Sequence, residues 1–504
     1  MYWPLSSPCF TTGCSCYVGA EPLARRSQDG GSCPPAVEPA QLQRGPQFIP
    51  IGSASLSEPK NEDAHAGVAA RGRRPHTSYD ATVRILGPSV LALALLSACA
   101  PREDVLTFSG SVLGAEGAIV RQQIERYAER YPGLRIEMQP TPDAADQRRQ
   151  LYVQWLNAWA PDPDILQLDV IWTPEFAAAG WILALDALPG GAYAASDDFF
   201  PATVTANQWQ GRPYAVPWFV DVGMLYWRTD LSTEAPGTFD ALMADARRAI
   251  DAGQVATGFV WQGARYEGLV TVFVEHLAGF GGAILDDGGR VVVDSENAVR
   301  ALTFMRDAVH QQALSPASVL TWREEQTRFA FQNGRAAFMR NWPYAAALLR
   351  DERESAVAGR FAVAPMPREA GQAAAALGGA QLAINARSRQ PDAAWRLVQY
   401  LTAPEQMIER AQVAGQFPSR RSTYDDERMR EALPIDPATV RAIIDRAVPR
   451  PVTPVYSELS GILQIHLHRA LTRQQEPRES LHAAAAAMRA VLDRAGLSGP
   501  GGRP

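Results

Sequence analysis

The strongest constraint on the fold is an alternation of two hydrophobic patterns along the second part of the chain. Short apolar runs, such as VLTFS at 105–109 and the run at 165–168, are typical of buried strands. The segment 115–131 between them places apolar side chains on one helical face. Strand–helix alternation with short turns predicts an α/β fold with largely parallel sheets.

The same alternation continues toward the C-terminus, without a repeat of fixed period. After Cys99 no segment is long and apolar enough to span a membrane. Further strands are predicted at 135–139, 224–227, 336–339, 361–364 and 381–384, with a hairpin at 285–293. Further helices are predicted at 143–159, 239–252, 267–280, 298–312 and 392–402, and in the tail from Ser457.

Length and charge narrow the class of protein. A chain of 504 residues can form two or more hydrophobic cores, at roughly 150 residues per domain. The net charge of −6 gives no support for nucleic-acid binding, which usually needs a basic surface. Lys60 is the only lysine, so a phosphate-binding loop of the GK type and a Schiff-base lysine are excluded after Cys99.

The cysteines and histidines offer no metal or disulfide framework to the main body. No cysteine follows Cys99, and the histidines are scattered without a ligand motif. We therefore expect no metal and no cofactor. The five cysteines are Cys9, Cys14, Cys16, Cys33 and Cys99.

The region before Cys99 has the pattern of an export signal preceded by an extension. Residues 1–79 are rich in Gly, Pro, Ser and Arg without periodicity, which predicts disorder or sequence that is not normally translated. The arginines up to Arg84 precede an apolar stretch at 85–96, too short at about 1.5 Å per residue to cross a bilayer of about 30 Å. We interpret 80–98 as a signal peptide. The alternative is a buried strand or helix with an incidental cysteine.

The tetrapeptide Leu96-Ser97-Ala98-Cys99 resembles the lipobox of bacterial lipoproteins. The resemblance implies that Cys99 becomes the lipidated first residue of the mature chain. The position of this signal, after 84 preceding residues, favours a true translation start near Val83 or elsewhere within 70–84, and a wrongly included N-terminal extension.

Six stretches, taken in their order, resemble the extracellular solute-binding proteins of bacterial ABC importers. The likeness is to the large sugar-binding family, and within it to the trehalose/maltose-binding branch; it covers essentially all of 99–504. The stretches are LTFSGSVLGAEGAIVRQQIERYAERYPGLRIEM, PDILQLDVIWTPEFAAAGWILALD, YAVPWFVDVGMLYWRTDL, FVWQGARYEGL, AAFMRNWPYA and LGGAQLAIN.

The resemblance implies an α/β fold of two lobes with a hinge and a ligand cleft between them, as in periplasmic binding proteins. One lobe is expected at 99–217 and 380–433, the other at 222–377 and 434–504. It implies a monomeric receptor, not an enzyme, that binds a sugar and delivers it to the permease subunits of the importer. Such a receptor works in the periplasm or at the outer face of the cytoplasmic membrane.

A sugar offers hydroxyl groups at its edges and an apolar C–H face, so its site needs carboxylates, arginines and flat aromatic rings. Four acids fit this need. Glu116 follows a glycine-rich turn, Asp169 ends a strand, Asp221 lies among apolar residues of PWFVDVG, and Glu267 begins a helix. Their alternative roles are helix capping, dipole compensation or a buried ion pair.

Four further residues are predicted to contact the sugar. The resemblance implies that Trp342, with Tyr344 beside it in RNWPYA, stacks on the sugar. Gly379 in LGGAQ would let the backbone approach, and Arg420 would reach a hydroxyl. Their alternatives are core packing, a simple turn and surface solvation. Arg421 is an equal rival of Arg420. Weaker candidates are Trp218, Trp261, Tyr266, Arg148, Arg149 and Tyr456.

Two other functions remain open at this level. An exported glycoside hydrolase would use two of the four acids as an acid–base pair, with a spacing that sequence cannot measure. A sugar-sensing lipoprotein would bind the same ligand without feeding a permease.

Overall fold

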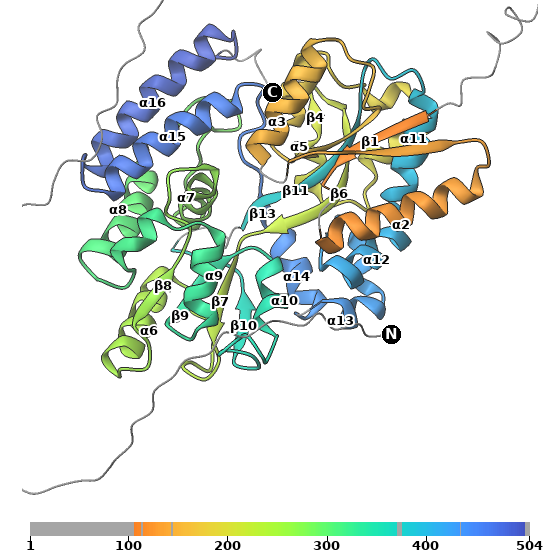
Figure 1. The fold of residues 1–504 in the computed structure, drawn as a ribbon. Helices are drawn as coiled ribbons and strands as arrows, with labels where there is room; N and C mark the ends of the chain where they lie inside the picture. Colours follow the sequence, from red (N-terminus) through yellow and green to blue (C-terminus); the bar gives the residue numbers. More distant parts are fainter. Residues whose placement is uncertain (1–104, 112–113, 143–144, 370–374, 434, 499–504) are drawn as a thin grey trace, which may run out of the picture. The chain divides into compact units, whose positions relative to one another are not determined.

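The computed structural model describes residues 105–498, apart from 112–113, 143–144, 370–374 and 434 (Figure 1). The predicted extension at 1–79, the signal peptide at 80–98 and the lipidation site Cys99 lie outside the described residues. Within them, no helix is long and apolar enough to cross a membrane.

The first sheet has the strand order β12-β6-β11-β3-β1-β2, and β13 pairs with β11. Strand β1 runs parallel to β2 and β3, but β11 runs antiparallel to both β3 and β6. The bounds are β1 Val105–Gly110, β2 Arg135–Pro140, β3 Ile165–Asp169, β6 Ala215–Val222, β11 Ala375–Ile384, β12 Phe417–Pro418 and β13 Ala447–Val448.

The second sheet has the order β10-β7-β9-β8, with only its β8–β9 pair parallel. The prediction of largely parallel sheets is therefore wrong, because long-range returns such as β11 pair with earlier strands in the opposite direction. The α/β class itself is confirmed. The bounds are β7 Met224–Arg228, β8 Thr257–Val260, β9 Ala336–Asn341 and β10 Phe361–Ala364.

Amphipathic helices pack around the first sheet. The apolar face of α11, which includes Leu397 and Leu401, is fully buried in a core that contains strand residues such as Leu382. Prolines begin α11 and α12, where the missing N–H costs no hydrogen bond. The helices are α2 Gly114–Arg130, α3 Ala145–Asn157, α4 Thr173–Ala178, α5 Pro201–Ala206, α11 Pro391–Leu401, α12 Pro404–Ala414, α13 Arg428–Ala432 and α14 Pro437–Ile444.

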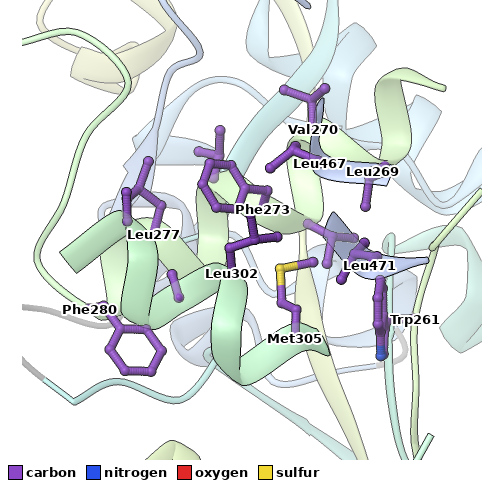
Figure 2. Packing of buried hydrophobic residues seen from close by; sticks show 14 of the residues in the cluster. Trp261, Leu269, Val270, Phe273, Leu277, Phe280, Leu302, Met305, Leu467 and Leu471 are labelled. Atoms are coloured by element: carbon purple, nitrogen blue, oxygen red, sulfur yellow. The ribbon is translucent and has the colours of Figure 1, made fainter. Parts of the chain in front are cut away.

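The core beside the second sheet centres on α7, which is apolar on almost every side. Figure 2 shows Phe273 and Leu277 of this helix packing with Leu302 of α8 and Leu467 of α15. The C-terminal helices α15 and α16 pack against each other and against α8 (Figure 1). The helices are α6 Phe239–Asp251, α7 Glu267–Gly279, α8 Glu296–His310, α9 Glu324–Gln332, α10 Tyr344–Leu349, α15 Tyr456–Leu471 and α16 Pro477–Arg494.

Short elements complete the described chain, and the predicted helices and strands all have counterparts in it. The hairpin expected at 285–293 is reduced to a single bridge between Leu285 and Val291. The limits of the two expected lobes stay a prediction. The short elements are the 3₁₀ turns η2 Leu185–Ala187, η3 Gly191–Ala195, η4 Ala317–Thr321 and η5 Arg421–Asp425, and the strands β4 Gln208–Trp209 and β5 Arg212–Pro213.

Strand β6 of the first sheet continues into β7 of the second through a single residue, Gly223. A β-carbon on Gly223 would lie 1.7 Å from Glu275 Oε1 and 2.5 Å from Arg340 Nη2. Neither of these two charged side chains has exposed surface. Arg340 Nε donates to Glu275 Oε2 at 2.7 Å, and a second bond joins Nη2 to Oε1. Gly223, which links the two sheets, therefore packs directly against the buried ion pair of Glu275 and Arg340.

The buried pair gives the first prediction. Replacing Arg340 by Met leaves Glu275 without its countercharge, and should lower the free energy of unfolding by about 3–5 kcal/mol. The matched control is Arg478→Met, which breaks a bidentate pair with Glu296 in which both side chains are exposed. It should cost about 0–1 kcal/mol. Urea unfolding of both variants checks this, and equal losses would show that burial of the first pair has no special weight.

Candidate functional site

A cleft of about 820 Å³ is lined by residues of the first sheet and its helices on one side, and by residues that follow or pack beside strands of the second sheet on the other. This volume lies within the range of about 300–1,000 Å³ that is typical of small-molecule sites. Its lining combines acids, arginines and aromatic rings. These are Glu116, Asp169, Asp221, Glu267 and Glu324; Arg148, Arg323 and Arg450; and Phe219, Tyr266, Trp342 and Tyr344.

Strand register brings two of the predicted acids together. Asp169 at the end of β3 lies opposite Ala380 of β11, and Asp221 of β6 lies opposite Gly378, two residues away along the same strand. Because β11 separates β3 from β6, the two carboxylates lie on either side of it. Glu116 joins them from the first turn of α2.

Gly379, between the two paired positions, lines the cleft as predicted. Its φ is +107°, and a β-carbon would lie 2.2 Å from the carbonyl oxygen of Phe219. Only glycine fits this conformation and this close approach without strain. The strand therefore presents bare backbone to the cleft between Asp169 and Asp221.

The three acids interact electrostatically. The protein around Asp221 desolvates its carboxylate, and the nearby charges of Glu116 and Asp169 add to this effect, raising the pKa of Asp221 to about 7. Glu116 Oε1 accepts a hydrogen bond from Gln167 Nε2 at 3.3 Å. Asp169 Oδ1 accepts one from the backbone N–H of Ile171 at 3.2 Å. The site therefore offers several carboxylate acceptors, and the raised pKa of Asp221 makes the charge of that one group depend on pH near neutrality.

Trp342, just after β9, and Tyr344, the first residue of α10, both line the cleft. The guanidinium carbon of Arg340 lies 4.0 Å from the centroid of the Trp342 ring, a cation–π contact that supports the ring. The Tyr344 hydroxyl donates to Glu325 at 2.7 Å. Both predicted rings thus stand where a ligand in the cleft can meet them.

Tyr266 also lines the cleft, with its hydroxyl donating to Glu324 at 2.7 Å. The guanidinium carbon of Arg323 lies 4.7 Å from the Tyr266 ring centroid. Arg323 and Glu324 come from the start of α9, far from the predicted residues in sequence. Sequence reasoning missed both, because nothing local distinguishes them from an ordinary charged helix N-terminus.

Glu267 lines the cleft at the first position of α7, but its carboxylate is already engaged. Oε1 accepts from Arg450 Nη1 at 2.7 Å and from the Tyr456 hydroxyl at 2.6 Å. Oε2 accepts from the Ser460 hydroxyl. Arg450 itself was missed, since it follows β13 in a proline-rich segment with no recognisable motif. Tyr456, a weak ligand candidate, is buried as a partner of Glu267.

The expectation that Arg420 lines the cleft is not met. Arg420 Nε donates to the carbonyl oxygen of Thr402 at 2.9 Å, and Nη1 donates to Asp198 at 2.9 Å. Its guanidinium carbon also lies 4.1 Å from the Phe199 ring centroid. The side chain is buried next to η5, and these protein groups use its hydrogen-bond donors. Its rival Arg421 lies near Asp445 instead, at 3.6 Å.

Two of the weaker tryptophan candidates belong to the core. Trp218 is buried with Arg410 stacked 3.8 Å from its ring centroid. Trp261 is buried and donates from Nε1 to Ser315 Oγ at 3.1 Å. Of the two neighbouring arginine candidates, Arg148 lines the cleft, whereas Arg149 forms an ion pair with Glu175 and does not line it.

No group of three or more metal-binding side chains occurs in the described part of the chain. The cleft therefore offers hydrogen-bond acceptors, cationic donors and aromatic faces. This arrangement can bind a polar ligand that carries both hydroxyl groups and an apolar face.

Two mixed sheets with helices packed around them, linked from β6 to β7 through Gly223 and bordering one cleft, form the architecture of periplasmic binding proteins. Residues 111–408 match the profile of the bacterial extracellular solute-binding proteins. The chain belongs to this family. A probable ABC transporter-binding protein from Deinococcus radiodurans is 34% identical to it over 406 residues, covering 78% of this chain and 94% of the relative. Because the family consists of binding proteins, the prediction of a receptor rather than an enzyme is confirmed.

Solved structures agree with this assignment. Maltose-bound MalE3 of T. maritima is 40% identical, with a TM-score of 0.69, and the match covers 77% of this chain and all of that one. The GacH receptor of Streptomyces glaucescens matches with a TM-score of 0.66 at 24% identity, over 77% of this chain and 98% of the receptor. This second likeness shows the fold alone.

The raised pKa of Asp221 gives a prediction for the ligand-free protein. A folded-state pKa above the unfolded value means that protonated Asp221 favours folding, and that this contribution is lost as pH rises from about 4 through about 7. Asp221→Asn should therefore raise the melting temperature by a few degrees at pH 8 and leave it unchanged near pH 4.

Differential scanning calorimetry across this pH range measures the effect. Asp186→Asn is the control, since Arg212 lowers the pKa of Asp186, so its charge favours the folded state. This variant should not gain stability at pH 8. A constant difference between Asp221→Asn and wild type from pH 4 to pH 8 would contradict the assignment.

Proposed function

We propose that this chain is the sugar receptor of an ABC importer and binds a di- or oligosaccharide of the maltose or trehalose type. The observation that carries the proposal is the pairing of carboxylates from the first sheet with aromatic rings from the second across one cleft. The MalE3 structure at 40% identity, which contains maltose, supports the ligand class.

The acids would accept hydrogen bonds from sugar hydroxyls, with Asp169 and Asp221 on either side of β11 and Glu116 beside them. Hydrogen bonds to an ionised acceptor are roughly twice as strong as neutral ones, so a few suffice for orientation. Trp342 and Tyr344 would cover the C–H face of a sugar ring. Gly379 lines the cleft between the two acids, where its backbone can approach the sugar.

Ligand exchange would depend on closure of the cleft about the strands that join the two sheets. A sugar that touches groups of both sheets binds the closed arrangement better than the open one, and this difference in affinity drives closure. The closed receptor would then deliver the sugar to the permease subunits of the importer.

A panel of sugars tests the ligand class. Maltose, trehalose, sucrose and maltotriose are each added to the purified protein, and the melting temperature is recorded. A ligand at about 100 times its Kd stabilises the folded state by roughly 2.7 kcal/mol, which shifts the melting temperature clearly. If no sugar of the panel shifts it while a non-sugar ligand does, the proposed ligand class is wrong.

Trp342→Ala should weaken binding of the sugar that shifts the melting temperature most, by about tenfold or 1.4 kcal/mol, because the ring loses its stacking face. Trp159→Ala is the matched control. Trp159 is 63% exposed, stacks with Arg387 and does not line the cleft. Titration calorimetry of both variants measures the effect, and an equal loss in both would refute the stacking role.

We also propose that the receptor is exported and anchored by a lipid on Cys99. Cys99→Ser should release it from the membrane fraction and abolish incorporation of labelled palmitate in a bacterial host. Mass spectrometry of the native protein then locates the mature N-terminus. A mature chain that retains residues 1–79 would contradict both the signal peptide and the anchor.

A further inference from the structure

The carboxylate of Glu267 accepts three hydrogen bonds from buried protein groups. Arg450, Tyr456 and Ser460 all donate to it, and all three residues are buried. Ser460 in turn accepts from Gln464 Nε2 at 2.9 Å. A carboxylate that holds three internal donors has little capacity left for sugar hydroxyls.

Arg450 uses the same guanidinium to reach the first sheet. Nη2 donates to the carbonyl oxygen of Leu377 in β11 at 3.2 Å and lies 3.7 Å from Asp169 Oδ1. One buried side chain thus connects α7, through Glu267, with β11 and with the acid that ends β3. Arg450 also lines the cleft, so this connection forms part of the surface that a ligand meets.

Arg450 needs such support because its backbone is in neither a helix nor a strand. It lies between β13 and α15, in a segment that also contains Pro449, Pro451 and Pro454. An arginine side chain has many rotamers, and holding one of them costs conformational entropy. The fixed geometry must therefore come from side-chain contacts, and Glu267 supplies the charged one from α7.

We propose that Glu267 is a positioning residue rather than a sugar ligand: together with Tyr456 and Ser460 it holds Arg450 beside Asp169 in the binding geometry. This inference rests on the proposed sugar-receptor function. It replaces direct sugar contact, predicted for Glu267 from sequence, by action through Arg450. It also makes the first turn of α15 part of the binding machinery, although no residue of that turn lines the cleft.

A double-mutant cycle tests the proposal. Maltose binding is measured by calorimetry for wild type, Glu267→Gln, Arg450→Met and the double variant. We expect each single change to weaken affinity by about tenfold, and the double variant to bind no more weakly than Arg450→Met alone, since Glu267 acts through Arg450. Losses that multiply in the double variant would show direct contact between Glu267 and the sugar, and overturn the proposal.

A milder variant guards against loss of folding. Tyr456→Phe removes one donor to Glu267 and keeps the buried ring, so the fold should persist while maltose affinity falls by about threefold. The control is Glu296→Gln, an exposed glutamate paired with Arg478 and outside the cleft, which should leave affinity unchanged. Wild-type affinity in both Tyr456→Phe and Glu267→Gln would overturn the positioning role.

The contact network is also measured without sugar. The same four proteins are unfolded in urea, and the stability effects of the two single changes should be strongly non-additive, because the two residues form an ion pair in which Arg450 is buried. Additive effects would show that Glu267 does not hold Arg450 in place, and would overturn the proposal. If the effects are coupled but wild type binds no sugar, the receptor proposal fails, and the positioning role fails with it.

Discussion

The ion pair between Glu275 and Arg340 lies where the two sheets are joined. Two charges without solvent contact are stable only while each has the other, so helix α7 and strand β9 are held together at that point. Gly223 has to be small because the pair fills the space where a side chain would extend. Glu275 also accepts from the backbone of Ala376 in β11, and Arg340 supports the Trp342 ring. The alignment of the two sheets and the position of the Trp342 ring thus both depend on the guanidinium of Arg340.

The cleft combines two kinds of positioning. The acids Asp169 and Asp221 are positioned by strand register, because both belong to strands that pair with β11. Trp342, Tyr344 and Arg450 are set by side-chain contacts around short connecting segments. The positions of the two acids therefore follow from the sheet, whereas the positions of the other three side chains depend on individual contacts that a single substitution can remove.

Much of this arrangement could be predicted from local patterns. Hydrophobic periodicity predicts the helices and strands. Asp169 at a strand end and Asp221 within an apolar run are candidates on the same local patterns, and both line the cleft; their contact with a sugar stays a prediction. Strand direction could not be predicted, since it depends on pairing between β11 and strands more than 150 residues away in sequence. Arg420 was misplaced, because an arginine beside a turn gives no sign that Asp198 and Thr402 will surround it. Arg450 and Glu324 were missed because their neighbours in space are distant in sequence.

The bare backbone at Gly379 limits how this receptor can diverge. Most positions around the cleft carry side chains that substitution can enlarge, shorten or recharge, so preference among related ligands can drift by small steps. Gly379 admits no such step, since its left-handed backbone and the adjacent carbonyl oxygen of Phe219 leave no room for a β-carbon. Any substitution at Gly379 would strain the pairing of β11 with β6, the strand that carries Asp221, so changes in ligand preference are easier to reach through the other residues that line the cleft.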